Sequence, residues 1–277
     1  DVTGDGVPEL LLTESDAFVA YVCEDGRYII KALPVWTYHY GQPLIIAIQD
    51  MNLDGVNETI AISGDERIRL VSVIGWDGSD FRSLVEDRTC STLYGPSWAE
   101  AQDVDDNGTF ELILRQEIPI WSEYVDGLPW RKETRTCTWN GRSFLLTHID
   151  IDTPPEYRFQ ATQDGDRASL DGDFDAALDL YQQAIFNNDL EWWSLDRRIY
   201  EMNTEGYRPT PIPTLLPDPA EYPALAAYAR FRMMLIHTIR GALSEAGVVY
   251  PTLQATYPQG QVGPAYAEIA TDFQAEY

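Results

Sequence analysis

A ten-residue pattern occurs three times in this 277-residue chain, and no other feature of the sequence constrains the fold as strongly. The copies are residues 1–10, 50–59 and 103–112. In each copy, oxygen-bearing side chains stand at positions 1, 3, 5 and 9, and glycine stands at position 6. Glycine at position 6 permits a backbone turn that a Cβ atom would oppose. The pattern therefore predicts three tight loops of the same kind.

These loops carry the ligands that a hard cation prefers. Ca²⁺ takes about six to eight oxygen ligands, and a tight loop turns alternate side chains and the position 7 carbonyl inward. Polar β-turns without metal are the alternative, because Asp, Asn and Gly are common turn residues. Each loop, however, holds at least three carboxylates within nine residues, which repel one another without a cation. The predicted Ca²⁺ ligands are Asp1, Thr3, Asp5, Val7 and Glu9 (loop 1), Asp50, Asn52, Asp54, Val56 and Glu58 (loop 2), and Asp103, Asp105, Asn107, Thr109 and Glu111 (loop 3).

An EF-hand shares the first six positions of the pattern but not its end. It needs a bidentate Glu at position 12, and an exiting helix follows. Position 12 holds Leu12, Ala61 or Leu114, within short aliphatic runs that are typical of strands. The sequence therefore predicts a Ca²⁺ loop within a β-hairpin.

The period of the pattern predicts a repeat fold. Successive copies begin 49 and 53 residues apart, a spacing typical of propellers, solenoids and arrays. Each unit also contains a second turn signal, Asp-Gly or Asn-Gly between apolar runs, which favours a type I′ hairpin. In the second unit the predicted strands include residues 44–48 and 68–74. Four antiparallel strands per unit are typical of a β-propeller blade.

The recurring run Asp-x-(Asn/Asp/Thr)-x-(Asp/Asn)-Gly-x-x-Glu, followed by a strand and a Trp-(Asp/Asn)-Gly-x-x-Phe hairpin, resembles FG-GAP/VCBS-type repeats. The resemblance covers residues 1 to about 150. It implies Ca²⁺-bearing propeller blades like those of integrin α-chains and many bacterial surface proteins. Because the chain opens on the first ligand of a loop, we also expect further units before Asp1, and with them any export signal.

The period changes after residue 152, where Thr153, Pro154 and Pro155 favour a boundary. The predicted domains are therefore a β domain at 1–152 and a helical domain at 153–277. An apolar helical stripe follows, comprising Leu170, Phe174, Ala177, Leu178, Tyr181 and Ile185.

This stripe resembles the second helix of a tetratricopeptide (TPR) repeat. A second match, with Gly241, Ala246 and Tyr250, begins 69 residues after Gly172, or about twice the TPR period. Residues 208–223 hold six prolines and predict an extended strap. A helix at 224–239 is apolar on most faces, which predicts burial on several sides.

Charge and cysteine content narrow the function classes. The net charge of −26 argues against binding to nucleic acids or an anionic membrane surface. The sequence contains no run of 18 apolar residues, so it predicts no membrane span. Cys23, Cys90 and Cys137 match no metal-site spacing and leave open one disulfide with one thiol left over.

No catalytic constellation is visible, so the sequence predicts a non-enzymatic binding protein of a bacterial surface or periplasm, with an unidentified protein or glycan partner. The alternative is the accessory part of a secreted, polysaccharide-active hydrolase whose chemistry lies upstream. His237 is expected to be a packed residue, and His39 belongs to an aromatic cluster that suits either sugar binding or blade packing. Candidate partner contacts are Trp192, Trp193, Tyr200 and Tyr207, with packing at the domain junction as the alternative.

Overall fold

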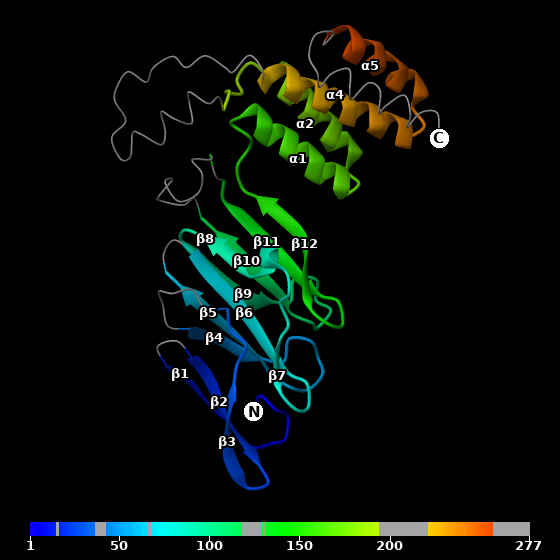
Figure 1. The fold of residues 1–277 in the computed structure, drawn as a ribbon. Helices are drawn as coiled ribbons and strands as arrows, with labels where there is room; N and C mark the ends of the chain where they lie inside the picture. The colour runs from blue at the N-terminus through cyan, green and yellow to red at the C-terminus, as the bar shows by residue number, and fades with distance from the viewer. Residues whose placement is uncertain are drawn as a thin grey trace, which may run out of the picture. The chain divides into compact units, whose positions relative to one another are not determined.

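The computed structural model describes residues 1–14, 17–36, 43–65, 68–117, 129, 131–193 and 221–256. The chain folds into two compact units, Asp1–Thr153 and Pro154–Tyr277. The described elements of the first unit are strands and one short 3₁₀ helix, and those of the second are α-helices (Figure 1). The predicted order of β-sheets followed by helices is confirmed. The predicted boundary lies one residue before the observed division.

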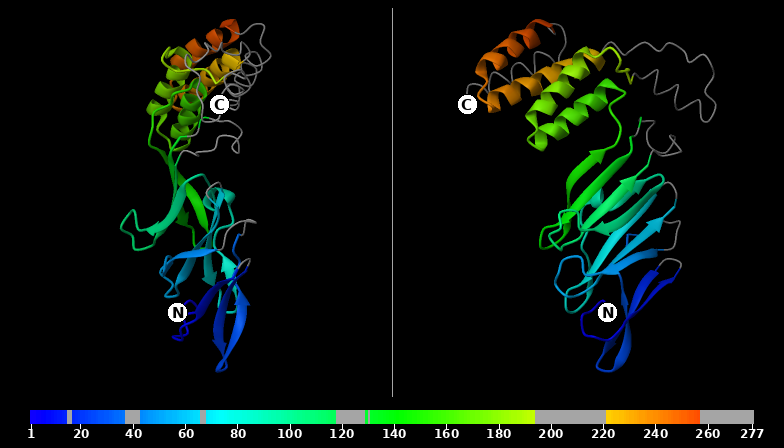
Figure 2. Two further views of the ribbon diagram at one scale, coloured as in Figure 1. Left: turned by 90° about the vertical axis from the view of Figure 1, so that its left-hand side faces the viewer. Right: turned by 180° about the vertical axis from the view of Figure 1, so that it is seen from behind.

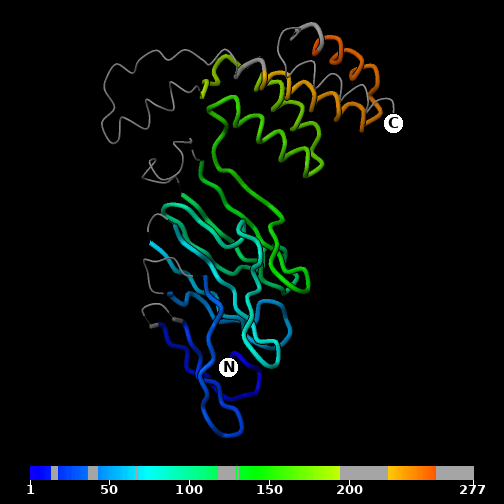
Figure 3. The backbone as a smooth tube through the Cα atoms, viewed as in Figure 1, coloured from blue at the N-terminus to red at the C-terminus, as the bar shows by residue number. Residues whose placement is uncertain are grey.

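Unit 1 contains three antiparallel sheets that the chain visits in sequence order (Figure 3). Sheet 1 comprises β1 (Leu10–Glu14), β2 (Ala17–Glu24) and β3 (Arg27–Ala32). Sheet 2 comprises β4 (Leu44–Gln49), β5 (Glu58–Gly64), β6 (Ile68–Trp76) and β7 (Phe81–Ser83), and β8 (Thr92–Tyr94) also pairs with β6. Sheet 3 comprises β9 (Ser97–Gln102), β10 (Glu111–Gln116), β11 (Glu133–Trp139) and β12 (Phe144–Ile151). The 3₁₀ helix η1 (Arg88–Cys90) precedes β8.

Sheets 2 and 3 are built in the same way. The loop formed by the repeated pattern connects the first two strands of each sheet, and the Asp-Gly or Asn-Gly turn connects β6 to β7 and β11 to β12. The strands predicted at 44–48 and 68–74 correspond to β4 and β6. In the described part of the chain, sheet 1 shows the strands after its loop but none before it.

The turns differ from the type I′ expectation in two of the three sheets. Asp25 and Gly26 both have positive φ and form a two-residue turn between β2 and β3. After β6 and β11 the loops have four residues, and only the glycine has positive φ. There the first residue shapes the turn, because Asp77 Oδ1 and Asn140 Oδ1 each accept the backbone amides two and three residues further on.

The sheets pack face to face, and sheet 2 is covered on both sides. Side chains alternate between the two faces of a strand. Ile60, Val71 and Val73 belong to the core shared with sheet 3, whereas Ala61 and Ile74 belong to the core shared with sheet 1. Sheet 3 contributes Leu112, Leu114, Cys137 and Phe144 to the first core, and sheet 1 contributes Phe18, Ala20 and Val22 to the second. The three described sheets form an open stack and do not close on themselves.

Unit 2 contains the helices α1 (Arg158–Leu170), α2 (Phe174–Phe186), α4 (Glu221–Ile239) and α5 (Leu243–Thr256) (Figures 1 and 2). The helix predicted at 224–239 is confirmed as α4, and its buried residues include Ala226, Ala227, Ala229, Met233 and Met234. α4 begins at Glu221, so the last three residues of the predicted strap are helical. Pro223 is compatible with the first turn, where its missing N–H leaves no bond unmade. Residues 208–220 lie outside the described part.

The stripe predicted from Leu170 needs one correction. Leu170 is the last residue of α1 and is 83% exposed, and the stripe begins at Phe174 in α2. Asp171, Gly172 and Asp173 separate the two helices, and Gly172 has a φ of +81°. Spacing alone joined Leu170 to the stripe, because residues four apart share a helix face only within one helix.

The α1–α2 pair packs closely around a tyrosine. Tyr181 is fully buried, and its hydroxyl donates to Asp166 Oδ1 at 2.5 Å. Arg232 Nε donates to the same hydroxyl at 3.1 Å, and the Tyr228 hydroxyl donates to Asp166 Oδ2 at 2.9 Å. This network joins α1, α2 and α4. In the described part of the chain, no helix combines the length and apolar character that crossing a membrane requires.

Candidate metal sites

Loops 1, 2 and 3 (residues 1–9, 50–58 and 103–111) share one backbone conformation. The glycines at position 6 have φ values of +83°, +87° and +91°. Position 4 is also left-handed in every loop, at Gly4, Leu53 and Asp106, with φ values of +75°, +63° and +57°. A left-handed leucine costs conformational energy. Its presence in loop 2 shows that the bonds of the loop determine the backbone there.

The carboxylate at position 1 closes each loop. One of its oxygens accepts the backbone N–H of the glycine at position 6, at 2.7 Å in loop 1, 3.0 Å in loop 2 and 2.9 Å in loop 3. The other oxygen of Asp50 is buried and has no hydrogen-bond partner in the described structure. An orphaned, buried carboxylate oxygen has lost its hydration without compensation. A cation in loop 2 would supply the missing partner.

Positions 3 and 5 also turn their oxygens into the loops. Position 5 accepts the N–H of position 7 in all three, at 2.7 to 2.8 Å, which holds Val7, Val56 and Thr109 in the loop. Position 3 accepts the N–H of position 5 in loops 2 and 3. In loop 1, Thr3 instead donates its hydroxyl to Glu9 Oε1 at 2.8 Å.

The glutamate at position 9 has a second role that spacing did not predict. One carboxylate oxygen accepts the backbone N–H of position 2 and so fastens the end of each loop to its beginning. The bonds are Val2 to Glu9 at 2.7 Å, Met51 to Glu58 at 2.8 Å and Val104 to Glu111 at 3.0 Å. The sequence signal for this role was available, since position 9 is Glu rather than the shorter Asp in all three copies.

The carboxylates converge in loops 1 and 3. Asp1, Asp5 and Glu9 form one group whose oxygens lie within 4.8 Å of one another, and Asp103, Asp105 and Glu111 form another. Both groups can hold a metal ion, and they offer only oxygen. In loop 2, Glu58 Oε1 accepts a hydrogen bond from Asn52 Nδ2 at 3.2 Å, and its three carboxylates do not converge in this way.

Glu58 is the most perturbed carboxyl of the three loops. Its burial raises the pKa to about 7, with the charges of Asp54 and Asp50 acting in the same direction and the Met51 N–H bond opposing them. Burial in a low-dielectric environment disfavours the charged carboxylate, whereas a nearby cation favours it. A bound metal would therefore convert Glu58 to the ionised form near neutral pH.

The loops lie side by side. Asn57 Nδ2 of loop 2 donates to the Asp1 carbonyl of loop 1 at 2.9 Å. The amide of Phe110, just before Glu111, donates to the Met51 carbonyl of loop 2 at 2.8 Å. Gly4 leaves space for loop 2, because a Cβ atom at this position would lie 2.8 Å from Val56 Cγ2. The acidic side chains of all three loops are thus gathered along one margin of unit 1.

The structure also supports the choice of a hairpin loop over an EF-hand. Leu12, Ala61 and Leu114, at position 12, lie in strands β1, β5 and β10. The first two strands of sheets 2 and 3 are antiparallel neighbours on either side of the loop. The expectation that the loops lie within hairpins therefore matches the geometry of sheets 2 and 3, whereas metal binding stays a prediction.

Other candidate residues have structural partners. Trp192 and Trp193 lie against the start of α1, where the Arg158 guanidinium is 4.6 Å from the Trp192 ring centre and Tyr157 packs edge-on against Trp193. His237 is half-buried in α4. His39, Tyr200 and Tyr207 lie outside the described residues. Cys90 and Cys137 form a disulfide, so Cys23 is the remaining thiol.

Comparison with known proteins identified no relative. No family model matches the chain, and no curated protein or solved structure matches it significantly.

Proposed function

We propose that the three loops bind Ca²⁺ and that unit 1 is a run of propeller blades of the FG-GAP/VCBS type. The observation that carries the proposal is the repetition of one loop geometry three times, with the same bonds from positions 1, 5 and 9. Polar turns that bind no ligand are not constrained to repeat the same hydrogen-bond pattern in three separate loops. The oxygen-only donor set suits a hard cation.

Calcium fits these loops better than magnesium. Mg²⁺ demands nearly ideal octahedral geometry and retains several waters, whereas Ca²⁺ accepts irregular cages of carboxylate, amide and carbonyl oxygens. The loops mix these three ligand types, and the residue at position 3 is Thr in loop 1, Asn in loop 2 and Asp in loop 3. Extracellular Ca²⁺ modules typically have dissociation constants of roughly 10⁻⁴ to 10⁻³ M.

The blade assignment is supported by the packing of the sheets. Each sheet follows its neighbour in sequence and covers it face to face, so sheet 2 has a core on both sides. Radial repetition of such sheets is the architecture of a propeller. In unit 2, a TPR-like helix pair is supported by the close approach of Gly165 in α1 to Tyr181 in α2 and by the buried Ala177 and Ala184.

The chain then acts as a non-catalytic scaffold outside the cytoplasm that binds a protein or glycan. The buried disulfide between Cys90 and Cys137 supports this location, because structural disulfides persist in oxidising compartments. The pI of about 4.2 and the three acidic loops also suit a medium in which Ca²⁺ is abundant.

Thermal unfolding of the full chain tests the proposal. Adding Ca²⁺ at one hundred times the dissociation constant stabilises the folded state by about 2.7 kcal/mol per site, so the melting temperature should rise with Ca²⁺ and fall with chelator. Mg²⁺ at the same concentration should have a smaller effect. Melting curves that neither Ca²⁺ nor chelator moves would rule out the structural role of calcium.

A matched pair of variants assigns the effect to a loop. Asp105→Ala removes a carboxylate from the acidic group of loop 3. Asp77→Ala, the control, removes an exposed turn aspartate that also accepts two backbone amides but belongs to no acidic group of the described structure. Titration calorimetry should show one site fewer in Asp105→Ala and an unchanged number in Asp77→Ala. Equal site numbers in both variants would contradict binding in loop 3.

A further inference from the structure

Unit 1 contains a cavity of about 540 Å³ that is separate from the metal loops. Its walls come from β6, from the segment containing η1 and β8, and from strands β11 and β12. Trp36 also lines it. Cavities of roughly 300 to 1,000 Å³ with apolar walls and a few polar groups are the usual form of small-molecule sites. The volume of this cavity lies within that range, and its lining combines five apolar residues with seven polar or charged ones.

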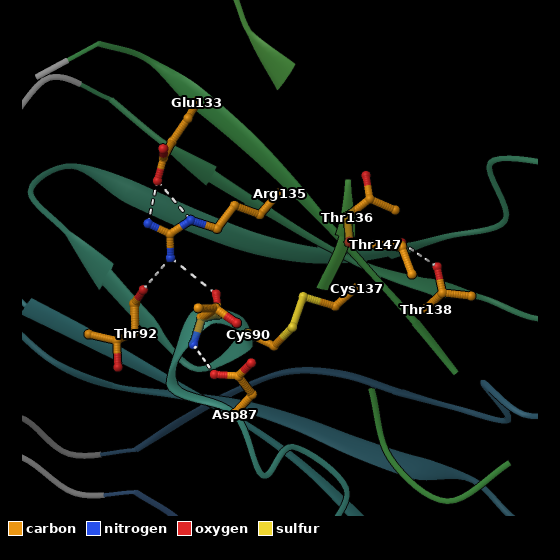
Figure 4. Close-up of a disulfide and its surroundings, with 10 residues drawn as sticks. Asp87, Cys90, Thr92, Glu133, Arg135, Thr136, Cys137, Thr138 and Thr147 are labelled. Carbon is orange, nitrogen blue, oxygen red and sulfur yellow. Dashed lines mark hydrogen bonds and ion pairs between the residues drawn. A yellow bond between two sulfur atoms is a disulfide. The ribbon is translucent and has the colours of Figure 1, made fainter. Parts of the chain in front are cut away.

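A disulfide and a pair of hydrogen bonds from Arg135 join the walls of the cavity (Figure 4). The Cys90–Cys137 disulfide joins the end of η1 to β11. Arg135 in β11 donates through Nη1 to the carbonyls of Thr89 and Thr92, at 3.1 and 2.9 Å. These links join segments that are more than forty residues apart in the sequence. The walls formed by η1, β8 and β11 are therefore fixed to one another by the fold.

The two arginines of the cavity differ in how many of their N–H donors already have a hydrogen-bond partner. Arg135 uses Nη1 for the two carbonyls and Nε and Nη2 for Glu133, which occupies four of its five N–H donors. Arg88 lines the same cavity with an exposed side chain, and its guanidinium has no ion-pair or hydrogen-bond partner in the described structure. Among the described residues that line the cavity, Arg88 is therefore the positive charge that has no partner.

The remaining lining has a polar part, from Thr89, Ser91, Thr92 and Tyr94, and an apolar part with a partly open aromatic ring. Ile68, Leu70, Leu146 and Ile149 supply the aliphatic part. Trp36 remains 44% exposed, although its backbone is anchored by a bond from its N–H to Ser72 Oγ at 3.0 Å. A large aromatic side chain that stays exposed at the edge of a cavity offers a face on which a ligand ring can stack.

Charge decides the class of ligand. The chain has 45 acidic and 19 basic residues, so an anion is repelled from most of the molecule. The cavity holds two arginines against one glutamate, and that glutamate is already bound to Arg135. We propose that this cavity binds a small organic anion, with its apolar or aromatic body against Trp36 and the aliphatic wall and its acidic group on Arg88. Such a site is independent of calcium.

A pair of fluorescent probes tests the site. 8-Anilinonaphthalene-1-sulfonate carries a sulfonate on an aromatic body, and N-phenyl-1-naphthylamine has the same body without the charge. The native chain should bind both probes at one site. Arg88→Gln should weaken sulfonate binding by about fivefold and leave the neutral probe unchanged, since one exposed ionic contact is lost. Arg82→Gln, the matched control at an exposed arginine of β7 outside the lining, should change neither affinity.

A second variant tests the apolar wall. Ile149→Trp places a larger side chain on the β12 side of the cavity and should weaken both probes. Calorimetry of each variant checks that unfolding is still cooperative. Raised salt should weaken the sulfonate selectively, because it screens the contact with Arg88. Equal sulfonate affinities in Arg88→Gln and Arg82→Gln, or both probes unaffected by Ile149→Trp in a folded chain, would overturn the proposal.

Discussion

Replacing Gly165 with alanine should destabilise unit 2, although alanine is the better helix former. A Cβ atom on Gly165 would lie 2.8 Å from Cε1, 3.0 Å from Cδ1 and 3.1 Å from Cζ of Tyr181. The ring cannot easily withdraw, because it is fully buried and its hydroxyl is bonded to Asp166 and Arg232. Overpacking of this kind costs about 1 to 3 kcal/mol. Helix propensity returns about 1 kcal/mol. The net loss should therefore reach about 2 kcal/mol if the ring cannot move.

Gly247→Ala is the matched control. Gly247 lies inside α5, is exposed, and has no atom within 4 Å of the Cβ position. The same substitution should therefore stabilise the chain by about 0.5 to 1 kcal/mol. Scanning calorimetry of both variants should show shifts in melting temperature of opposite sign. A double-mutant cycle with Tyr181→Leu should show strong coupling to Gly165→Ala. A rise in melting temperature for Gly165→Ala equal to that for Gly247→Ala would refute the packing argument.

Three further outcomes are expected. Tyr181→Phe removes the hydroxyl that donates to Asp166, and urea unfolding should show a loss of about 1 to 2 kcal/mol, with no change if the network is dispensable. The Cys90–Cys137 disulfide closes a loop with a sequence separation of 47, so reducing it should lower the free energy of unfolding by about 4 kcal/mol through the entropy of the unfolded chain. An unchanged melting temperature in reductant would contradict this. Because the raised pKa of Glu58 lets the metal-free folded state keep a proton that the unfolded state releases, stability should fall as pH rises from about 4.5 to about 7. Ca²⁺ should restore more stability at pH 8 than at pH 6, and Glu58→Gln should flatten the apo profile if the assignment is right.

The sequence alone was sufficient for features that arise within about ten residues. The conformation of loops 1, 2 and 3 is of this kind, because glycine at position 6 and the acceptors at positions 1 and 5 act on backbone groups of the same loop. The strand order in sheets 2 and 3 followed from the short loop and turn signals between the strands. The change from strands to helices near residue 153 followed from the proline pair there. The correction at Leu170 shows the limit, since a helical spacing does not reveal where one helix ends.

Only the tertiary structure decided which distant groups meet. Three cysteines allow three pairings, and Cys90 reaches Cys137 because sheets 2 and 3 pack face to face. The cavity beside Arg88 depends on the same packing, which no local pattern encodes. Glu58 occupies the same position of the repeated pattern as Glu9 and Glu111, so the sequence does not single it out. Its raised pKa arises because packing against neighbouring elements excludes water from an acidic loop. Local hydrogen bonds are determined by short-range chain geometry, whereas burial and long-range pairing depend on how all the sheets assemble.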